Sequence, residues 1–147
     1  MKDFKSLNVY LSDLAVMNVK LHNLHWNVEG RNFYQVHTFT EGLYDTFFEW
    51  FDAVAEVMKM RGEFPFASLK DYLANATIKE LDSVKVTVDE VNEIVLNDLV
   101  TLKEEALKVR EEADEAGDFS VVGMLEDHIG ELEKNIWFLR ASKPCCK

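Results

Sequence analysis

The feature of this sequence that most constrains its fold is the length of its uninterrupted helical patterns. Apolar residues recur at spacings of three and four through four long segments: about Phe4–Val28, Phe33–Arg61, Val88–Ala116 and Asp118–Ala141. Glycine (6) and proline (2) are scarce among the 147 residues, so the chain has few turns. A chain of this length fits one domain, 1–147. The pattern predicts an all-α protein.

Local signals mark where these helices begin and end. Gly30-Arg31-Asn32 separates the first two segments, and Gly117 closes the third, after which Asp118 is expected to cap the fourth. Thr77-x-x-Glu80 and Thr87-x-x-Glu90 both fit the capping-box pattern, and the second is expected to open the third long helix. A short helical piece near Ser68–Ala74 lies in the long connection before it. Four long helices with one such crossover predict a four-helix bundle.

Composition excludes several classes of function. The formal net charge of −11 argues against a nucleic-acid partner held by a basic surface, and it favours recruitment of cations. No apolar stretch is long enough to span a membrane, and the residues after Met1 lack a signal-peptide pattern, so the cytoplasm is the expected location. Cys145 and Cys146 sit within the last three residues, where they are expected to be tail thiols without a function.

The second long helix has two chemically different faces. At about 100° per residue, its aromatic and aliphatic side chains share an arc of about 160°. Its acidic side chains share an arc of about 80°. These acidic residues are Glu41, Asp45, Glu49, Asp52 and Glu56. Taken alone, the acidic stripe is typical of a solvated helix face, and the aromatic face is typical of core.

Two histidines give the acidic stripe another interpretation. His25 and His37 lie six residues on either side of Arg31, so an antiparallel hairpin that turns at Arg31 brings them level. Glu41 follows His37 by four residues, the spacing that puts both side chains on one helix face. Two imidazoles and a carboxylate form a reasonable half-site for a first-row metal, although each histidine alone is usually a packed or exposed residue.

Asp52 and Glu56 form a second carboxylate pair on the same stripe. Asp52 follows His37 by 15 residues, which is about 22 Å along a straight helix. One metal ion therefore cannot contact both within a single chain. If the helix meets its own copy antiparallel across a two-fold axis, His37 and Glu41 face Asp52 and Glu56 of the mate. The spacing predicts a metal site between subunits.

An intrachain di-iron centre is not expected. Such centres in four-helix bundles use Glu-x-x-His on two helices. Among the residues of this sequence, none of the four histidines has a glutamate three positions earlier.

The sequence resembles the Dps family, the mini-ferritins named for DNA protection during starvation. The matching residues cover nearly the whole chain. They are His25-Trp26-Asn27-Val28-x-Gly30, Phe33, His37, Glu41, Asp52-x-x-x-Glu56, Arg61-Gly62-x-x-Pro65, Gly117-Asp118 and Glu133-x-x-x-Trp137-x-x-x-Ala141. The combined spacing of histidines and acids is far more specific than any single element.

The resemblance implies a ferritin-like bundle that assembles into a hollow dodecamer. It implies ferroxidase sites at two-fold interfaces, where His25, His37 and Glu41 of one subunit meet Asp52 and Glu56 of its mate. Iron is then the metal, hydrogen peroxide or O2 the oxidant, and ferric mineral the stored product. The resulting function is protection of the cell from iron and peroxide damage.

The same resemblance implies roles for three further residues. Trp26 is a candidate sink for stray oxidising equivalents, with interface packing as the alternative. Asp118 and Asp127 resemble acids that line three-fold pores, with helix capping and a solvated face as the alternatives. Some relatives carry another acid where this chain has Gly123, which weakens the pore assignment.

Other functions remain open at the level of sequence. Some Dps proteins bind DNA through lysine-rich tails, but here only Lys2 and Lys5 lie near the start, so DNA binding is expected to be weak or absent. The rivals are a nucleoid-binding protein, a non-catalytic helical interaction module and a shell that sequesters metal with slow oxidation.

Overall fold

The structure is a computed structural model that describes residues 3–143 of the chain. It contains four long helices and one short one. They are α1 (Lys5–Asn27), α2 (Phe33–Met60), α3 (Leu69–Asn75), α4 (Val88–Glu115) and α5 (Phe119–Ala141). The predicted helix positions are confirmed to within about a residue at each end. Cys145 and Cys146 lie outside the described residues, so the expectation that they are tail thiols stays a prediction.

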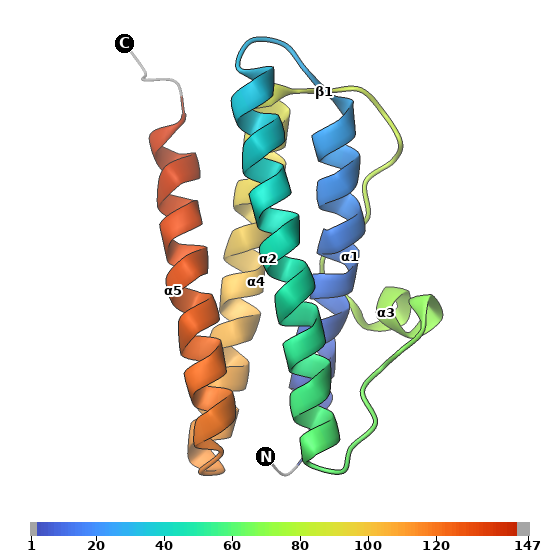
Figure 1. Cartoon of the computed structure of the whole chain (residues 1–147), viewed down its shortest axis with the longest axis vertical. Coiled ribbons are helices and arrows are strands. Elements are labelled where there is room, and N and C mark those ends of the chain that lie inside the picture. Colours follow the sequence, from blue (N-terminus) through green and yellow to red (C-terminus); the bar gives the residue numbers. More distant parts are fainter. Residues whose placement is uncertain (1–2, 144–147) are drawn as a thin grey trace.

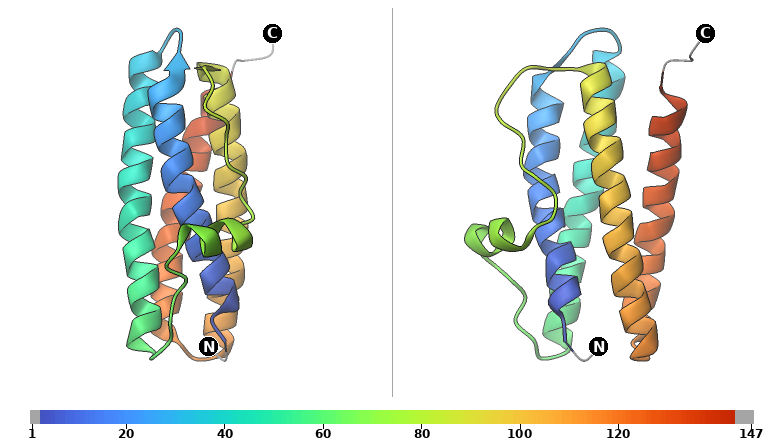
Figure 2. Two further views of the ribbon diagram at one scale, coloured as in Figure 1. Left: turned by 90° about the vertical axis from the view of Figure 1, so that its right-hand side faces the viewer. Right: turned by 180° about the vertical axis from the view of Figure 1, so that it is seen from behind.

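The four long helices lie side by side as two antiparallel hairpins. Helix α1 packs chiefly on α2, and α4 packs chiefly on α5. The connection from α2 to α4 travels the length of the bundle, so these two helices run in the same direction (Figure 1). Helix α3 lies in this connection, outside the bundle and against α1 (Figure 2). This confirms the predicted four-helix bundle with a crossover.

The core is built from the apolar stripe of each long helix. The apolar residues that repeat at helical spacing along α1 are fully buried, and they are Leu7, Leu11, Leu14, Met17, Leu21 and Leu24. On α2, Leu43, Phe47 and Val54 are buried as expected, whereas Phe48 is exposed on the surface of the single chain. Within residues 3–143, no helix combines the length and apolar character needed to cross a lipid bilayer.

The two capping-box sequences have different outcomes. Thr87 caps α4 and exchanges hydrogen bonds with Glu90, which confirms that prediction. Thr77 opens no helix. Its backbone N–H and its hydroxyl instead donate to Asp13 on α1, at 2.7 Å each. Asp13 also accepts from the N–H of Ile78, so a buried carboxylate anchors the crossover to the bundle.

A small parallel pairing joins the hairpin turn to the crossover. The strands β1 (Val28–Glu29) and β2 (Val86–Thr87) pair directly, with Val28 opposite Val86. The sequence predicts no strand here, because two residues are too few to show a period-two pattern. The pairing fixes the start of α4 next to the turn between α1 and α2.

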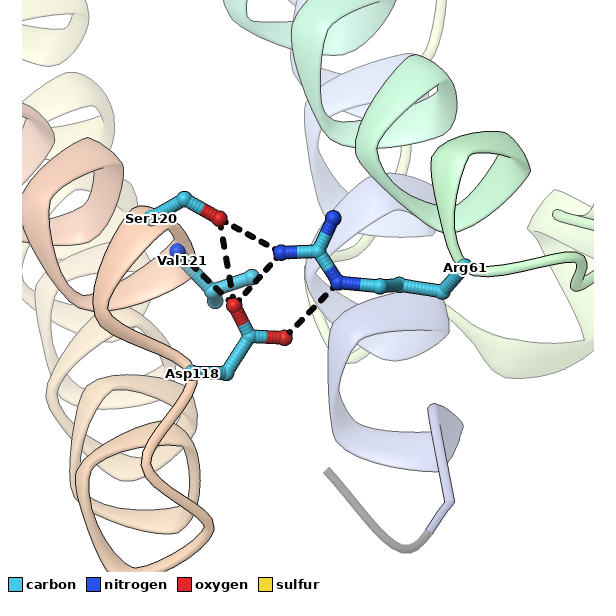
Figure 3. A network of polar contacts seen from close by, with 4 residues as sticks. All are labelled: Arg61, Asp118, Ser120 and Val121. Carbon is cyan, nitrogen blue, oxygen red and sulfur yellow. Dashed lines mark hydrogen bonds and ion pairs between the residues drawn. The ribbon is translucent and has the colours of Figure 1, made fainter.

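At the opposite end of the bundle, an ion-pair network joins α2 to α5. The guanidinium of Arg61 donates to both carboxylate oxygens of Asp118 and to the hydroxyl of Ser120 (Figure 3). Asp118 also accepts from the backbone N–H of Val121, so it caps α5 as predicted. The Arg61 side chain therefore joins the end of α2 to the start of α5.

Candidate metal centre

The two histidines predicted to come level are in direct contact. Their rings stack with centroids 3.5 Å apart and an interplanar angle of 16°. His25 comes from the last turns of α1 and His37 from the second turn of α2. The connecting turn is tight because Gly30 and Asn32 both take positive φ values, of 122° and 64°. The expectation of a hairpin that turns at Arg31 is thus confirmed.

Reciprocal hydrogen bonds determine which ring nitrogens are free. The Nδ1 of His25 lies 2.7 Å from the carbonyl oxygen of His37, and the Nδ1 of His37 lies 2.9 Å from the carbonyl oxygen of His25. A carbonyl oxygen can only accept, so each Nδ1 carries the hydrogen. In the neutral rings, each Nε2 then keeps the lone pair that a metal ligand needs.

Thr40 supports this arrangement from the next turn of α2. Its fully buried hydroxyl lies 3.2 Å from the Nδ1 of His25 and donates to the backbone carbonyls of Val36 and His37. Thr40 is not among the residues that the sequence predicts for the site. The only sequence signal for a role of Thr40 in the site is its position between two predicted ligands, three residues after His37 and one before Glu41. Thr40 helps to hold the tautomer in which the Nε2 of His25 is free.

Aromatic rings surround the histidine pair on both sides. Phe33 stacks on His37 with centroids 5.1 Å apart. On the other side, Tyr44 meets His25 edge-on at 5.3 Å and stacks on His22 at 3.8 Å. Tyr44 is one of the aromatic residues of the second long helix, whose aromatic face is predicted to be core, and the sequence predicts no role for His22. The packing of α1 against α2 brings both residues to the histidine pair.

The acidic residues predicted to complete the site are exposed in the single chain. Glu41, Asp52 and Glu56 all have solvent-accessible side chains on α2. Within residues 3–143, no three histidine, cysteine or acidic side chains converge closely enough to hold a metal ion. A single chain thus presents a pair of imidazoles and, further along the same helix, a pair of carboxylates.

The two candidate pore residues differ in their surroundings. Asp118 is engaged by Arg61 and by the N-terminus of α5, and the Arg61 guanidinium holds the pKa of its carboxyl below the ordinary value. Asp127 is exposed on α5. The capping alternative for Asp118 is therefore realised in the chain, while the pore role of both residues stays a prediction.

His128 lies in the bundle core, away from this site. Its ring stacks on Trp50 with centroids 4.0 Å apart, and its Nδ1 lies 3.1 Å from the hydroxyl of the fully buried Tyr10. Burial lowers the pKa of His128 to about 4. These contacts give His128 a packing role inside the bundle.

The chain is similar to known proteins over nearly its whole length. The profile of the ferritin-like domain matches residues 4–142. The DNA protection during starvation protein of Helicobacter pylori is 32% identical over 141 residues, which are 96% of this chain and 98% of that protein.

Solved structures of Dps proteins superpose closely on this chain. A Dps protein from Bacillus brevis superposes with a TM-score of 0.89 at 37% identity, covering 96% of this chain and 98% of that one. Dps from Listeria innocua, in crystals soaked with zinc, superposes with a TM-score of 0.89 at 34% identity, covering 95% and 94%. The chain belongs to the Dps family of ferritin-like proteins.

Proposed function

We propose that this protein is a ferroxidase whose sites form between subunits of a dodecameric shell and whose ferric product is stored inside. Family membership supports a general role in iron storage or DNA protection. The stacked His25–His37 pair carries the more specific proposal. Both Nδ1 atoms are occupied by backbone carbonyls, so each of the two stacked rings keeps its Nε2 lone pair for a metal ion.

The exposed acids on α2 supply the other half of the proposed site. His25, His37 and Glu41 of one subunit would bind Fe(II) together with Asp52 and Glu56 of the mate. The two groups of ligands are separated along one helix, so an antiparallel pair of α2 helices creates two equivalent sites. An isolated chain offers only incomplete sites.

The ligand chemistry favours oxidation of the bound ion. Imidazole nitrogen binds Fe(II) well, and carboxylate oxygen, a hard anionic ligand, stabilises Fe(III) more strongly. Hydrogen peroxide is the proposed oxidant and takes one electron from each of two Fe(II) ions. The net charge of −11 per chain attracts Fe(II) to the assembly. Ferric product then passes to the acidic residues and mineral of the cavity.

A complementation experiment tests whether the site is shared between subunits. One variant carries His25→Gly and His37→Gly, and a second carries Asp52→Ala and Glu56→Ala. Neither alone should oxidise Fe(II) rapidly when peroxide follows anaerobic loading. In co-assembled shells each mixed dimer has one complete site, so random pairing restores about a quarter of the sites. The rise in ferric absorbance measures the recovery.

The matched control changes two acids of the same stripe that the site does not use. Asp45→Ala with Glu49→Ala removes as much negative charge from α2 as the second variant and should retain most of the fast oxidation. Particle mass checks that every variant forms the same assembly. The shared site is wrong if co-assembly restores nothing, and the ligand set is wrong if either site variant oxidises iron at the original rate.

A further inference from the structure

We infer that Phe48 is the contact at which two copies of α2 meet, and that it positions the two halves of each proposed metal site. The inference rests on the proposed function, because only that function requires the histidine end of α2 to face the acidic pair of a second copy. Phe48 has no atom that binds a metal ion. Its contribution is to hold the ligands of two chains in register.

Phe48 is a large apolar side chain that the single chain leaves in contact with water. It is 63% exposed, whereas its neighbour Phe47 is buried in the core. Removing such a ring from water is favourable, so this exposed ring is a candidate contact with another molecule. The structure describes every residue of α2, and the other large apolar side chains that are exposed on it lie at its two ends: Phe33, Tyr34 and Met60. Phe48 alone lies between the two groups of proposed ligands.

Phe48 also lies on the same face of α2 as the proposed ligands. At about 100° per residue, its direction from the helix axis falls between those of His37 and Glu41, about 20° from each. Asp52 follows Phe48 by four residues, the spacing of neighbours on one helix face. A second copy that completes the metal site must therefore cover the Phe48 ring as well.

The register of the proposed helix pair places Phe48 close to the two-fold axis. His37 of one copy faces Glu56 of the mate, and Glu41 faces Asp52 in the same way. The axis then crosses α2 midway between these residues, between positions 46 and 47. Phe48 follows that point by about 2 Å along the helix. A residue so close to a two-fold axis lies near its own copy, so the two Phe48 rings come together.

An apolar contact at this position offsets repulsion between the two helices. The acidic stripe beside Phe48 carries five carboxylates, and antiparallel pairing brings two such stripes together. Before iron binds, these like charges repel one another. Burial of two phenyl rings against each other is attractive whether or not a metal ion is present. A central aromatic residue with polar groups around it is also the usual location of an interface's strongest contact. Phe48 therefore holds the empty half-sites together, ready for Fe(II).

Cross-linking of the assembled protein tests the position of Phe48. Phe48→Cys is combined with Cys145→Ser and Cys146→Ser, which leaves one thiol in each chain. A short bis-maleimide should convert most of the protein to covalent dimers, seen on a denaturing gel. The matched control is Phe64→Cys in the same background, because Phe64 is 83% exposed and lies beyond the end of α2. It should give far fewer dimers, and an equal yield from the two positions contradicts the inference.

Metal binding tests the positioning role. In anaerobic titrations, Phe48→Ala should bind Fe(II) several-fold more weakly than the wild type. Its oxidation rate with peroxide at saturating Fe(II) should change little, because every ligand is still present. Phe48→Leu keeps an apolar contact and should regain most of the affinity, and Phe64→Ala should bind as the wild type does. Unchanged Fe(II) affinity in Phe48→Ala overturns the positioning role. A wild-type protein that does not oxidise Fe(II) instead overturns the proposed function, and the cross-link then decides the helix contact by itself.

Discussion

The histidines of this protein occupy two contrasting settings. His25 and His37 stack at one end of the α1–α2 hairpin, with each Nδ1 held by a carbonyl oxygen of the other residue. His128 lies between Trp50 and Tyr10 in the bundle core, and its Nδ1 is used by a tyrosine hydroxyl. In the first setting the imidazole keeps a nitrogen free for a metal ion, and in the second it packs in the core. The difference lies in the neighbours, which are backbone carbonyls and a second imidazole in the first setting and Trp50 with Tyr10 in the second.

The largest expected effect comes from removing the core histidine. His128→Ala leaves a cavity beside Trp50 and removes the hydrogen-bond partner of Tyr10. These losses should lower the free energy of unfolding by about 3–5 kcal/mol per subunit. Urea denaturation at fixed protein concentration measures the loss. His37→Ala should reverse the pattern, with Fe(II) binding lost and stability nearly unchanged. Equal stability losses in both variants would remove the distinction between the two settings.

The second prediction concerns pH. The folded protein holds the pKa of His128 at about 4, below the ordinary 6.5. The unfolded chain therefore binds more protons between these values. The stability from neutral His128 is complete above about pH 6.5 and is lost as the pH falls towards 4, by roughly 3 kcal/mol at most. Denaturation curves across this range measure the change.

The matched variant for the pH experiment is His128→Asn, whose amide oxygen can accept from Tyr10 without titrating. Burial raises the pKa values of Asp13, Asp98 and Glu105, so these groups add stability as the pH falls. The difference between wild type and variant isolates the histidine. A difference that does not change between pH 7 and pH 4 would contradict the assigned protonation state.

A smaller effect should separate the two candidate pore residues. Asp118→Ala removes the cap of α5 and the partner of Arg61, and should cost about 1 kcal/mol of stability. Asp127→Ala should change stability by less than about 0.5 kcal/mol, because its side chain is exposed. Thermal denaturation measures both. If both residues line a pore, both variants should also slow iron uptake into the shell, which stopped-flow absorbance measures.

The smallest expected effect concerns the binding of DNA by the assembled protein. The relatives' names refer to DNA protection and do not support the prediction of weak binding, so that prediction depends on the charge of −11 per chain. A mobility-shift assay at physiological salt should show no retained complex. Tight retention that weakens steeply with added salt would make nucleoid binding the better function.

Much of the fold could be predicted because helices leave a local signal. The apolar stripe of α1 repeats at helical spacing and is fully buried, and Thr87 with Glu90 caps α4 as its pattern indicates. The contact between His25 and His37 could also be predicted. Residues at equal distances on either side of a tight turn at Arg31 come level in an antiparallel hairpin. The other half of the proposed site depends on a second subunit and stays a prediction.

Other features arise from contacts between distant segments. Thr77 has the sequence of a helix cap, but its partner is Asp13, which lies 64 residues away. His128 shares α5 with exposed acids, and only the approach of Trp50 and Tyr10 makes it a core residue. No local pattern identifies these partners, because a side chain's sequence neighbours do not report what packs against it.

The sequence by itself determined the helices, their order and the level placement of His25 and His37, because periodicity and a short turn act within a few residues of each position. The tertiary structure alone decided which nitrogen of each ligand imidazole is free and that His128 packs between Trp50 and Tyr10. It also decided that Tyr44 and His22 lie beside the proposed ligands. Those outcomes depend on the packing of whole helices, whose contacts join residues that share no local signal.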